Sequence, residues 1–173
     1  MEDLPPHILK PEVHWQRAQG YLAMEMYQDA LRELRALPIE EPWEKRGQVF
    51  LLTIYQEMAN WEDAQKVARG LRYEFPEEVD WWIADAYATR RHESIIEAQS
   101  ILLEGLTLHY DDGLIRFNLA CYACVLKSSG ECMDFLKEAV KRDEKLKLMA
   151  LEDDDLLDVR EALLKLGWGK ALV

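Results

Sequence analysis

The sequence predicts an all-α fold made of helix hairpins that repeat along the chain. A small residue returns every thirty-four residues, at Ala30, Ala64, Ala98 and Cys132. Apolar residues within each repeat lie three or four positions apart, which is the spacing of an amphipathic helix. A fixed period of this length is typical of stacked-repeat proteins, in which each unit buries its apolar face against its neighbours.

The second repeat shows the pattern most clearly, because Tyr55, Trp61, Ala64 and Pro76 lie within it. The same marks occur thirty-four residues earlier as Tyr21, Tyr27, Ala30 and Pro42. Residues 58–61 are too few for anything but a tight turn between two helices. The small side chain at position 64 allows the two helices to approach closely, and a proline fits the first turn of the next helix.

This spacing resembles the tetratricopeptide repeat, in which an aromatic and an alanine open the second helix and a proline starts the next repeat. The resemblance implies a right-handed α-solenoid of about four helix-turn-helix repeats, at residues 11–41, 42–75, 76–110 and 111–144. Residues 1–10 are then an irregular lead. Residues 145–173 are expected to form C-terminal capping helices and a tail, because the last repeat of an array needs a polar cover.

In the first three repeats, the first helix of each repeat is predicted to begin at a proline. These prolines are Pro11, Pro42 and Pro76. The second helix of the first repeat is expected at residues 27–37. Trp82 and Tyr87 are predicted to be core residues. The turn at residues 89–94 is expected to be about two residues longer than its counterparts, because Tyr87 stands only thirty-two residues after Tyr55.

In the fourth repeat, residues 111–113 predict a helix stop followed by an aspartate N-cap. Helices are expected at residues 114–127 and 132–142. Two more follow at 145–150 and 156–166, and Gly167 ends the last of them.

Composition limits the kind of partner. Hydrophobic residues make up 49% of the 173-residue chain, and 33 acidic residues against 21 basic ones give a net charge of −12. This balance argues against binding of nucleic acid, which requires a basic surface. It favours a basic partner weakly, and the alternative is that the acids only solvate the outer helix faces.

The location expected from the sequence is the cytoplasm. The first residues lack the apolar segment of a signal peptide, and no stretch approaches the roughly 20 apolar residues of a membrane span. The three cysteines are an odd number, which disfavours a secreted disulfide framework.

No enzymatic motif is found, so a non-enzymatic protein without a cofactor or metal is expected. Cys121 and Cys124 form a C-x-x-C pair, but it lies inside a predicted helix rather than at the helix start that redox chemistry needs. Two small packed residues are the simpler interpretation. The four histidines are scattered, and neither a G-x-S-x-G nor a phosphate-binding loop is present.

The resemblance implies that the first helix of each repeat lines a concave groove. Aligning the repeats gives these groove candidates: Trp15, Gln19, Arg46, Val49, Thr53, Trp81, Asp85, Arg116, Phe117 and Asn118. The alternative for the aromatic members is packing in the core. Some family members bind acidic C-terminal peptides through a clamp of Lys, Arg and Asn, and here the Lys–Asn pattern of the first groove helix is missing.

The function that follows is protein–protein interaction, with an extended or helical peptide bound in an apolar, partly aromatic groove. Two alternatives stay open. One is a secretion-type or assembly chaperone that cradles an apolar segment, and the other is a structural subunit of an oligomer, a homodimer included. The identity of the partner is not encoded in any recognisable motif.

Overall fold

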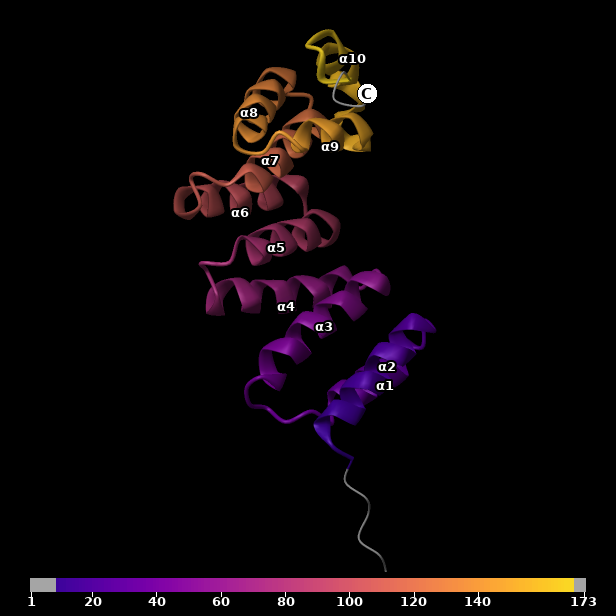
Figure 1. The fold of residues 1–173 in the computed structure, drawn as a ribbon. Helices are drawn as coiled ribbons and strands as arrows, with labels where there is room; N and C mark the ends of the chain where they lie inside the picture. The colour runs from indigo at the N-terminus through magenta and orange to yellow at the C-terminus, as the bar shows by residue number, and fades with distance from the viewer. Residues whose placement is uncertain (1–8, 170–173) are drawn as a thin grey trace, which may run out of the picture. The chain divides into compact units, whose positions relative to one another are not determined.

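The structure, a computed structural model, describes residues 9–169, and these form ten α-helices, one 3₁₀ helix and no strand (Figure 1). The all-α prediction is therefore confirmed. In chain order the elements are α1 (Pro11–Ala23), α2 (Tyr27–Leu34), α3 (Trp43–Glu57), α4 (Trp61–Glu74), α5 (Val79–His92), α6 (Ile95–Leu108), α7 (Gly113–Val125), α8 (Ser129–Arg142), α9 (Leu146–Glu152), η1 (Asp154–Leu156) and α10 (Leu157–Lys165). Among the described residues, no helix is both long and apolar enough to cross a membrane.

The chain divides into two compact units, residues 1–67 and 68–173, and the boundary falls within α4. In both of them, helices that follow one another in sequence pack against each other, as a helical-hairpin pattern requires.

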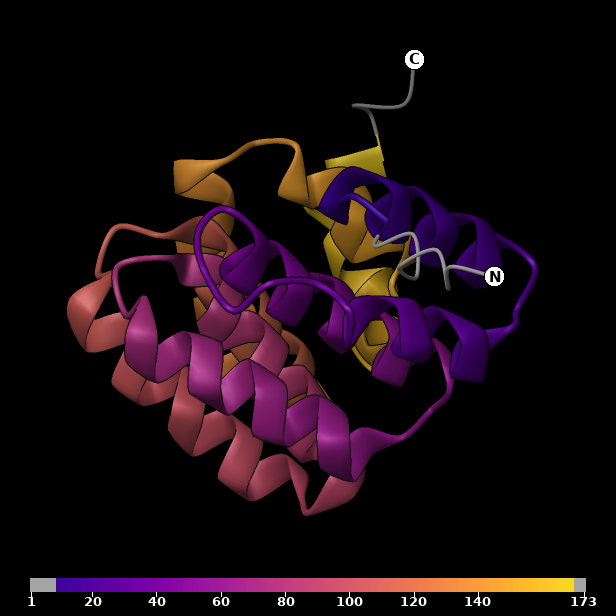
Figure 2. The same cartoon turned by 90° about the horizontal axis from the view of Figure 1, so that it is seen from below.

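In the first unit, α1 and α2 lie side by side and run antiparallel, as both views show (Figures 1 and 2). Pro11 occupies the first turn of α1, where its missing N–H costs no hydrogen bond. One buried cluster of this unit consists of Ala30, Leu31 and Ile54, with Tyr21 and Tyr55 among the partly buried residues around it. Helix α2 joins α3 to the hairpin.

Three of the turns within hairpins share one geometry. Their central residues are left-handed: Glu25 (φ 58°), Ala59 (φ 50°) and Lys127 (φ 64°). The next amide bonds back across the turn, from Met26 to Tyr21 at 2.9 Å, from Asn60 to Tyr55 at 2.9 Å and from Ser128 to Ala123 at 2.8 Å. This six-to-one bond is the Schellman closure of a helix C-terminus. The residues involved are spaced by thirty-four or twice thirty-four positions.

The turn between α5 and α6 departs from this geometry and corrects a prediction. A long turn at residues 89–94 was expected, but α5 continues to His92 and only Glu93 and Ser94 connect the helices. Ser94 caps α6 by accepting a hydrogen bond from the Glu97 amide at 3.2 Å. The amide of Glu93 bonds to the Thr89 carbonyl at 2.8 Å, which is a helical bond. The two residues by which the step from Tyr55 to Tyr87 falls short of thirty-four therefore lie within helix α5 and not in a longer turn.

Other element boundaries differ by a few residues from those expected. Helix α2 ends at Leu34 instead of residue 37, and α3 begins at Trp43, directly after Pro42. Helix α5 begins at Val79, three residues after Pro76. The carbonyl of Pro76 instead accepts a hydrogen bond from the indole Nε1 of Trp82 at 2.8 Å, which fixes the chain before α5.

The small residues that recur in the sequence are all buried. Ala30, Ala64, Ala98 and Cys132 have no exposed surface. A second set with the same step, Ala18, Leu52, Ala86 and Ala120, is also buried. Small side chains at such positions permit close helix packing, which supports the reason given for their recurrence.

In the second unit, α5 and α6 form one hairpin, and α7 and α8 form another. Trp82 is buried as predicted, and its ring packs so closely on Gly105 of α6 that an added Cβ would lie 2.9 Å from it. Tyr87 was predicted to be core, but 39% of it is exposed. Its ring lies on the protein surface, with the guanidinium of Arg91 3.5 Å from the ring centroid.

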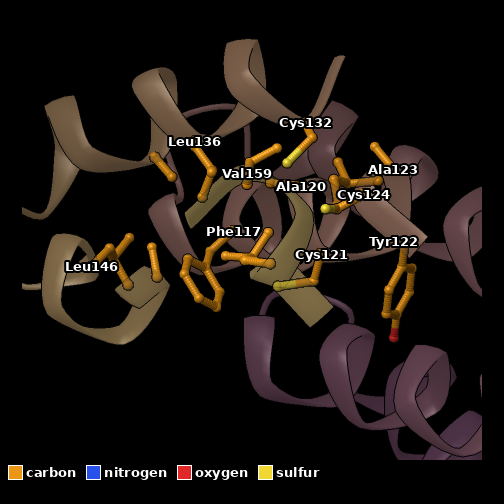
Figure 3. Close-up of a cluster of buried hydrophobic side chains, with 14 of the residues drawn as sticks. Phe117, Ala120, Cys121, Tyr122, Ala123, Cys124, Cys132, Leu136, Leu146 and Val159 are labelled. Atoms are coloured by element: carbon orange, nitrogen blue, oxygen red, sulfur yellow. The ribbon is translucent and has the colours of Figure 1, made fainter. Parts of the chain in front are cut away.

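The C-terminal helices pack on α7 and α8 of the second unit. The 3₁₀ helix η1 packs on α7, while α10 contacts α8 and α9. Asp153 caps η1 by accepting the Asp155 amide at 2.8 Å. Phe117, Leu146 and Val159 belong to one buried cluster, which joins α7 to these later helices (Figure 3). Gly167, with φ +81°, follows the last helix.

Candidate binding groove

A concavity of about 510 Å³ lies between α1 and α3 in the first unit. We name it the α1–α3 groove, and it is lined by Trp15, Glu41, Pro42, Lys45, Arg46, Val49, Phe50 and Thr53. Arg46, Val49 and Thr53 are three or four residues apart, so they lie on one face of α3, and Pro42 directly precedes this helix. Helix α1 contributes Trp15 from the opposite side.

Aromatic rings form the apolar part of the groove. The centroid of the Trp15 ring lies 5.0 Å from that of Phe50, and the two rings are tilted by 51°. On its other side, Trp15 lies 6.1 Å from the ring of Trp43. Such tilted contacts hold the rings in place without burying Trp15 completely. The groove therefore offers a fixed aromatic surface to an apolar side chain.

Polar groups surround this surface. Lys45 and Arg46 contribute positive charge, and Glu41 is the acid among the lining residues. The guanidinium carbon of Arg46 lies 5.7 Å from the centroid of the Trp43 ring, a cation–π distance. Thr53 donates its hydroxyl to the Val49 carbonyl at 3.2 Å, so its methyl group is the part left for contact.

Four of the ten predicted site residues line this groove together: Trp15, Arg46, Val49 and Thr53. Gln19 is exposed and follows Trp15 by one turn of α1, although it does not line the cavity. Sequence comparison of the repeats missed Phe50 and Pro42. Each lies four residues from Arg46, Phe50 within α3 and Pro42 directly before it, and this helical spacing was the signal that could have identified them.

Phe117 and Asp85 correct the prediction, because neither is accessible to a partner. Phe117 is 3% exposed and packs in the core with Leu146, since the C-terminal helices cover this part of α7. Asp85 has no exposed surface. The Nε of Arg72 lies 2.9 Å from its Oδ2, and Thr89 donates to its Oδ1 at 3.2 Å.

The electrostatics of Asp85 are those of a buried ion pair. Burial raises the pKa of Asp85 above its ordinary value, and the guanidinium groups of Arg72 and Arg69 partly offset this rise. The Arg72 guanidinium is itself held 4.7 Å from the ring centroids of both Tyr73 and Trp82. This network is a packing feature of α4 and α5 and leaves the carboxylate closed to ligands.

The side chains of the remaining candidates form hydrogen bonds to residues close to them in sequence. Trp81 donates its Nε1 to Glu78 at 2.9 Å, and Asn118 donates to the Leu114 carbonyl at 2.9 Å. Arg116 donates to the backbone carbonyls of Asp112 at 2.8 Å and of Tyr110. None of the three lines the α1–α3 groove.

The cysteines show no sign of activation. Cys121, Cys124 and Cys132 are buried and free. Burial raises the pKa of the Cys121 thiol, and it raises that of Cys132 to about 12. A reactive cysteine requires the opposite shift, because the thiolate is the nucleophile.

Cys121, Asp153 and Asp155 bring potential metal-ligand atoms within 4.8 Å of one another. However, Arg90 holds both carboxylate oxygens of Asp155, one of them at 2.8 Å. A guanidinium in this position supplies the positive charge that a cation would bring. The three side chains lie close together because Asp155 of η1 pairs with Arg90 of α5 and Asp153 accepts a hydrogen bond from Cys121 of α7.

A second cavity in the first unit, of about 280 Å³, lies between α2 and α3 on another face of α3. Leu31, Leu34, Leu37, Ile39 and Leu51 make most of its lining apolar. None of the predicted site residues belongs to it. Trp43 lines this cavity, and its ring centroid lies 6.1 Å from that of Trp15 in the α1–α3 groove.

Compared with known proteins, the sequence matches no family model, and no curated protein shows significant similarity to it.

Proposed function

We propose that this chain is a protein-binding scaffold of the tetratricopeptide type and that it binds a peptide segment in the α1–α3 groove. The proposal includes about four helix hairpins stacked as a right-handed solenoid. It is supported by two buried sets of residues with a thirty-four-residue step, in which Leu52 is the one residue that is not small, and by three left-handed turns at matching positions.

The observation that carries the proposal is the composition of the groove. Trp15 is held by Phe50 and Trp43 yet remains partly exposed, and Val49 and Pro42 extend the apolar surface beside it. Rigid aromatic side chains within a concave, partly desolvated surface are the typical energetic centres of protein interfaces. The volume of about 510 Å³ is sufficient for side chains of a bound peptide.

An extended or helical peptide is the ligand that this shape suits. The groove follows α3 from Pro42 to Thr53, which are eleven residues apart. At 1.5 Å per residue this corresponds to roughly 16 Å, the length of about five extended residues. A short linear segment with one apolar anchor would therefore fill the groove.

The test is a selection of random peptides displayed on phage, using the intact protein as bait. We expect a recurring apolar anchor among the selected peptides. Val49→Asp should weaken their binding by at least about ten-fold, since it places a charge on the apolar surface (roughly 1.4 kcal/mol). Ile96→Asp is the matched control, because Ile96 is 62% exposed on α6 and lies outside the groove. Equal binding by both variants would refute the site.

A further inference from the structure

We infer that the α1–α3 groove is specific for a segment in which an apolar side chain is accompanied by an Asp or Glu carboxylate. This inference rests on the proposed function and adds the chemistry of the partner. An acidic partner segment is the opposite of the basic partner that the net charge of −12 favours for the chain as a whole. The local charges of the groove carry it.

Arg46 is the central observation. It is exposed at the groove, and within residues 9–169 it forms no ion pair. Arg17 and Arg32 of the first unit differ in this respect, because Arg17 lies 3.7 Å from Glu33 and Arg32 lies 2.7 Å from Asp29. Arg35 is, like Arg46, exposed and without an ion pair in the described part of the chain, but it lines the other cavity. In a chain with 33 acidic residues, an exposed arginine without a carboxylate at a concave apolar site is available to a ligand.

The position of Arg46 makes its guanidinium a specific receptor. Contact with the face of Trp43, at 5.7 Å, restrains the side chain next to the apolar part of the groove. The N–H groups of a guanidinium lie in its plane and form a fork that matches two carboxylate oxygens. Stacking on an aromatic ring leaves this fork unoccupied.

The other charges at the groove do not reverse this preference. Lys45 adds a second positive charge, and Glu41 is the acid among the lining residues. A basic side chain of a partner placed beside Arg46 would meet a like charge, which is unfavourable. The local balance thus favours an anionic group beside the apolar anchor.

We assign the carboxylate to an Asp or Glu side chain rather than to the C-terminus of a partner. The family's clamp for C-terminal carboxylates uses Lys and Asn together with Arg. No asparagine is among the described residues that line the α1–α3 groove, so the set of Lys, Arg and Asn that such a clamp uses is incomplete there. Arg46 supplies one fork, and we assign it to a single side-chain carboxylate.

The experiment continues from the selected peptides. A synthetic peptide with an amidated C-terminus is compared with its Asp→Asn or Glu→Gln version by fluorescence anisotropy, using the wild-type protein, Arg46→Gln and Arg35→Gln. Arg35 is an exposed arginine that lines the other cavity, so it is a matched control. Circular dichroism checks that both variants are folded.

Wild type and Arg35→Gln should bind the acidic peptide more tightly than its amide version, by up to about five-fold, which corresponds to one well-formed exposed ion pair. With Arg46→Gln this difference should disappear. Peptides whose binding depends on Val49 but that show no acidic preference, or a preference that persists in Arg46→Gln, would overturn the inference and leave the groove assignment intact. Loss of all binding on amidation would overturn the assignment to a side chain. If no selected peptide depends on Val49, both the inference and the proposed function fail.

Discussion

At the scale of single residues, the carboxylate of Asp85 is a buried charge that must be compensated by neighbouring groups. It has no exposed surface, and Arg72, whose side chain is 6% exposed, supplies the nearest opposite charge at 2.9 Å. Removing one partner of a buried ion pair leaves a charge that neither water nor protein compensates. The pair therefore holds α4 and α5 together only while both partners are present.

Replacing Arg72 by Met should destabilise the protein by about 3–5 kcal/mol at neutral pH, because Met retains the apolar stem but not the charge. The pKa of Asp85, already raised by burial, should rise further without the guanidinium. A carboxyl with a raised folded-state pKa lowers stability as pH rises through that pKa. The deficit of the variant relative to wild type should therefore grow between about pH 4 and pH 7.

Urea denaturation of both proteins across this pH range measures the effect. Arg69→Met is the control, since Arg69 lies 3.7 Å from Asp85 and its side chain is 39% exposed. Its loss should cost at most about 1 kcal/mol, as for other partly exposed pairs. A deficit for Arg72→Met that does not change with pH would contradict this description of the pair.

At the scale of helices, the contact between α5 and α6 depends on the absence of a side chain at Gly105. A Cβ at this position would lie 2.9, 3.0 and 3.2 Å from three atoms of the Trp82 indole. The indole cannot move freely, because its Nε1 is bonded to the Pro76 carbonyl. Close packing of this hairpin thus requires glycine.

Gly105→Ala should lower stability by about 1–3 kcal/mol, the usual cost of overpacking, despite the better helix propensity of alanine. Gly70→Ala in α4 is the matched control, because nothing lies within 4 Å of its Cβ position. That substitution should raise stability by about 0.5–1 kcal/mol. Thermal denaturation shows whether each variant is more or less stable than wild type. A stabilised Gly105→Ala protein would show that the indole is less constrained than described.

The helices themselves could be predicted because local signals determine them. The recurrence of Ala30, Ala64, Ala98 and Cys132 marked positions that are all buried. Boundaries were less predictable where two local signals compete. Pro76 is a good first helical residue, yet its carbonyl is used by Trp82, and the helix begins at Val79.

At the scale of the whole molecule, the candidate site could be predicted in the first unit and not in the second. Aligning repeats places Trp15 and Val49 on equivalent faces, and both line the groove. The same alignment places Phe117 on that face, but residues about thirty and more positions later fold over it, Leu146 among them. A periodic pattern shows which face is apolar and carries no information about what covers it.

The central claim is that the α1–α3 groove is the surface that binds a protein partner. The measurement that tests it most directly is photo-crosslinking in the source cells with a photoreactive residue at Gln19, which is exposed one turn after Trp15 on α1. The same residue at Ile96 is the control. We expect a discrete crosslinked partner at Gln19 that is lost when Val49 is replaced by Asp. Crosslinks of equal yield and identity at Gln19 and Ile96, or adducts at Gln19 that persist with Val49→Asp, would contradict the claim.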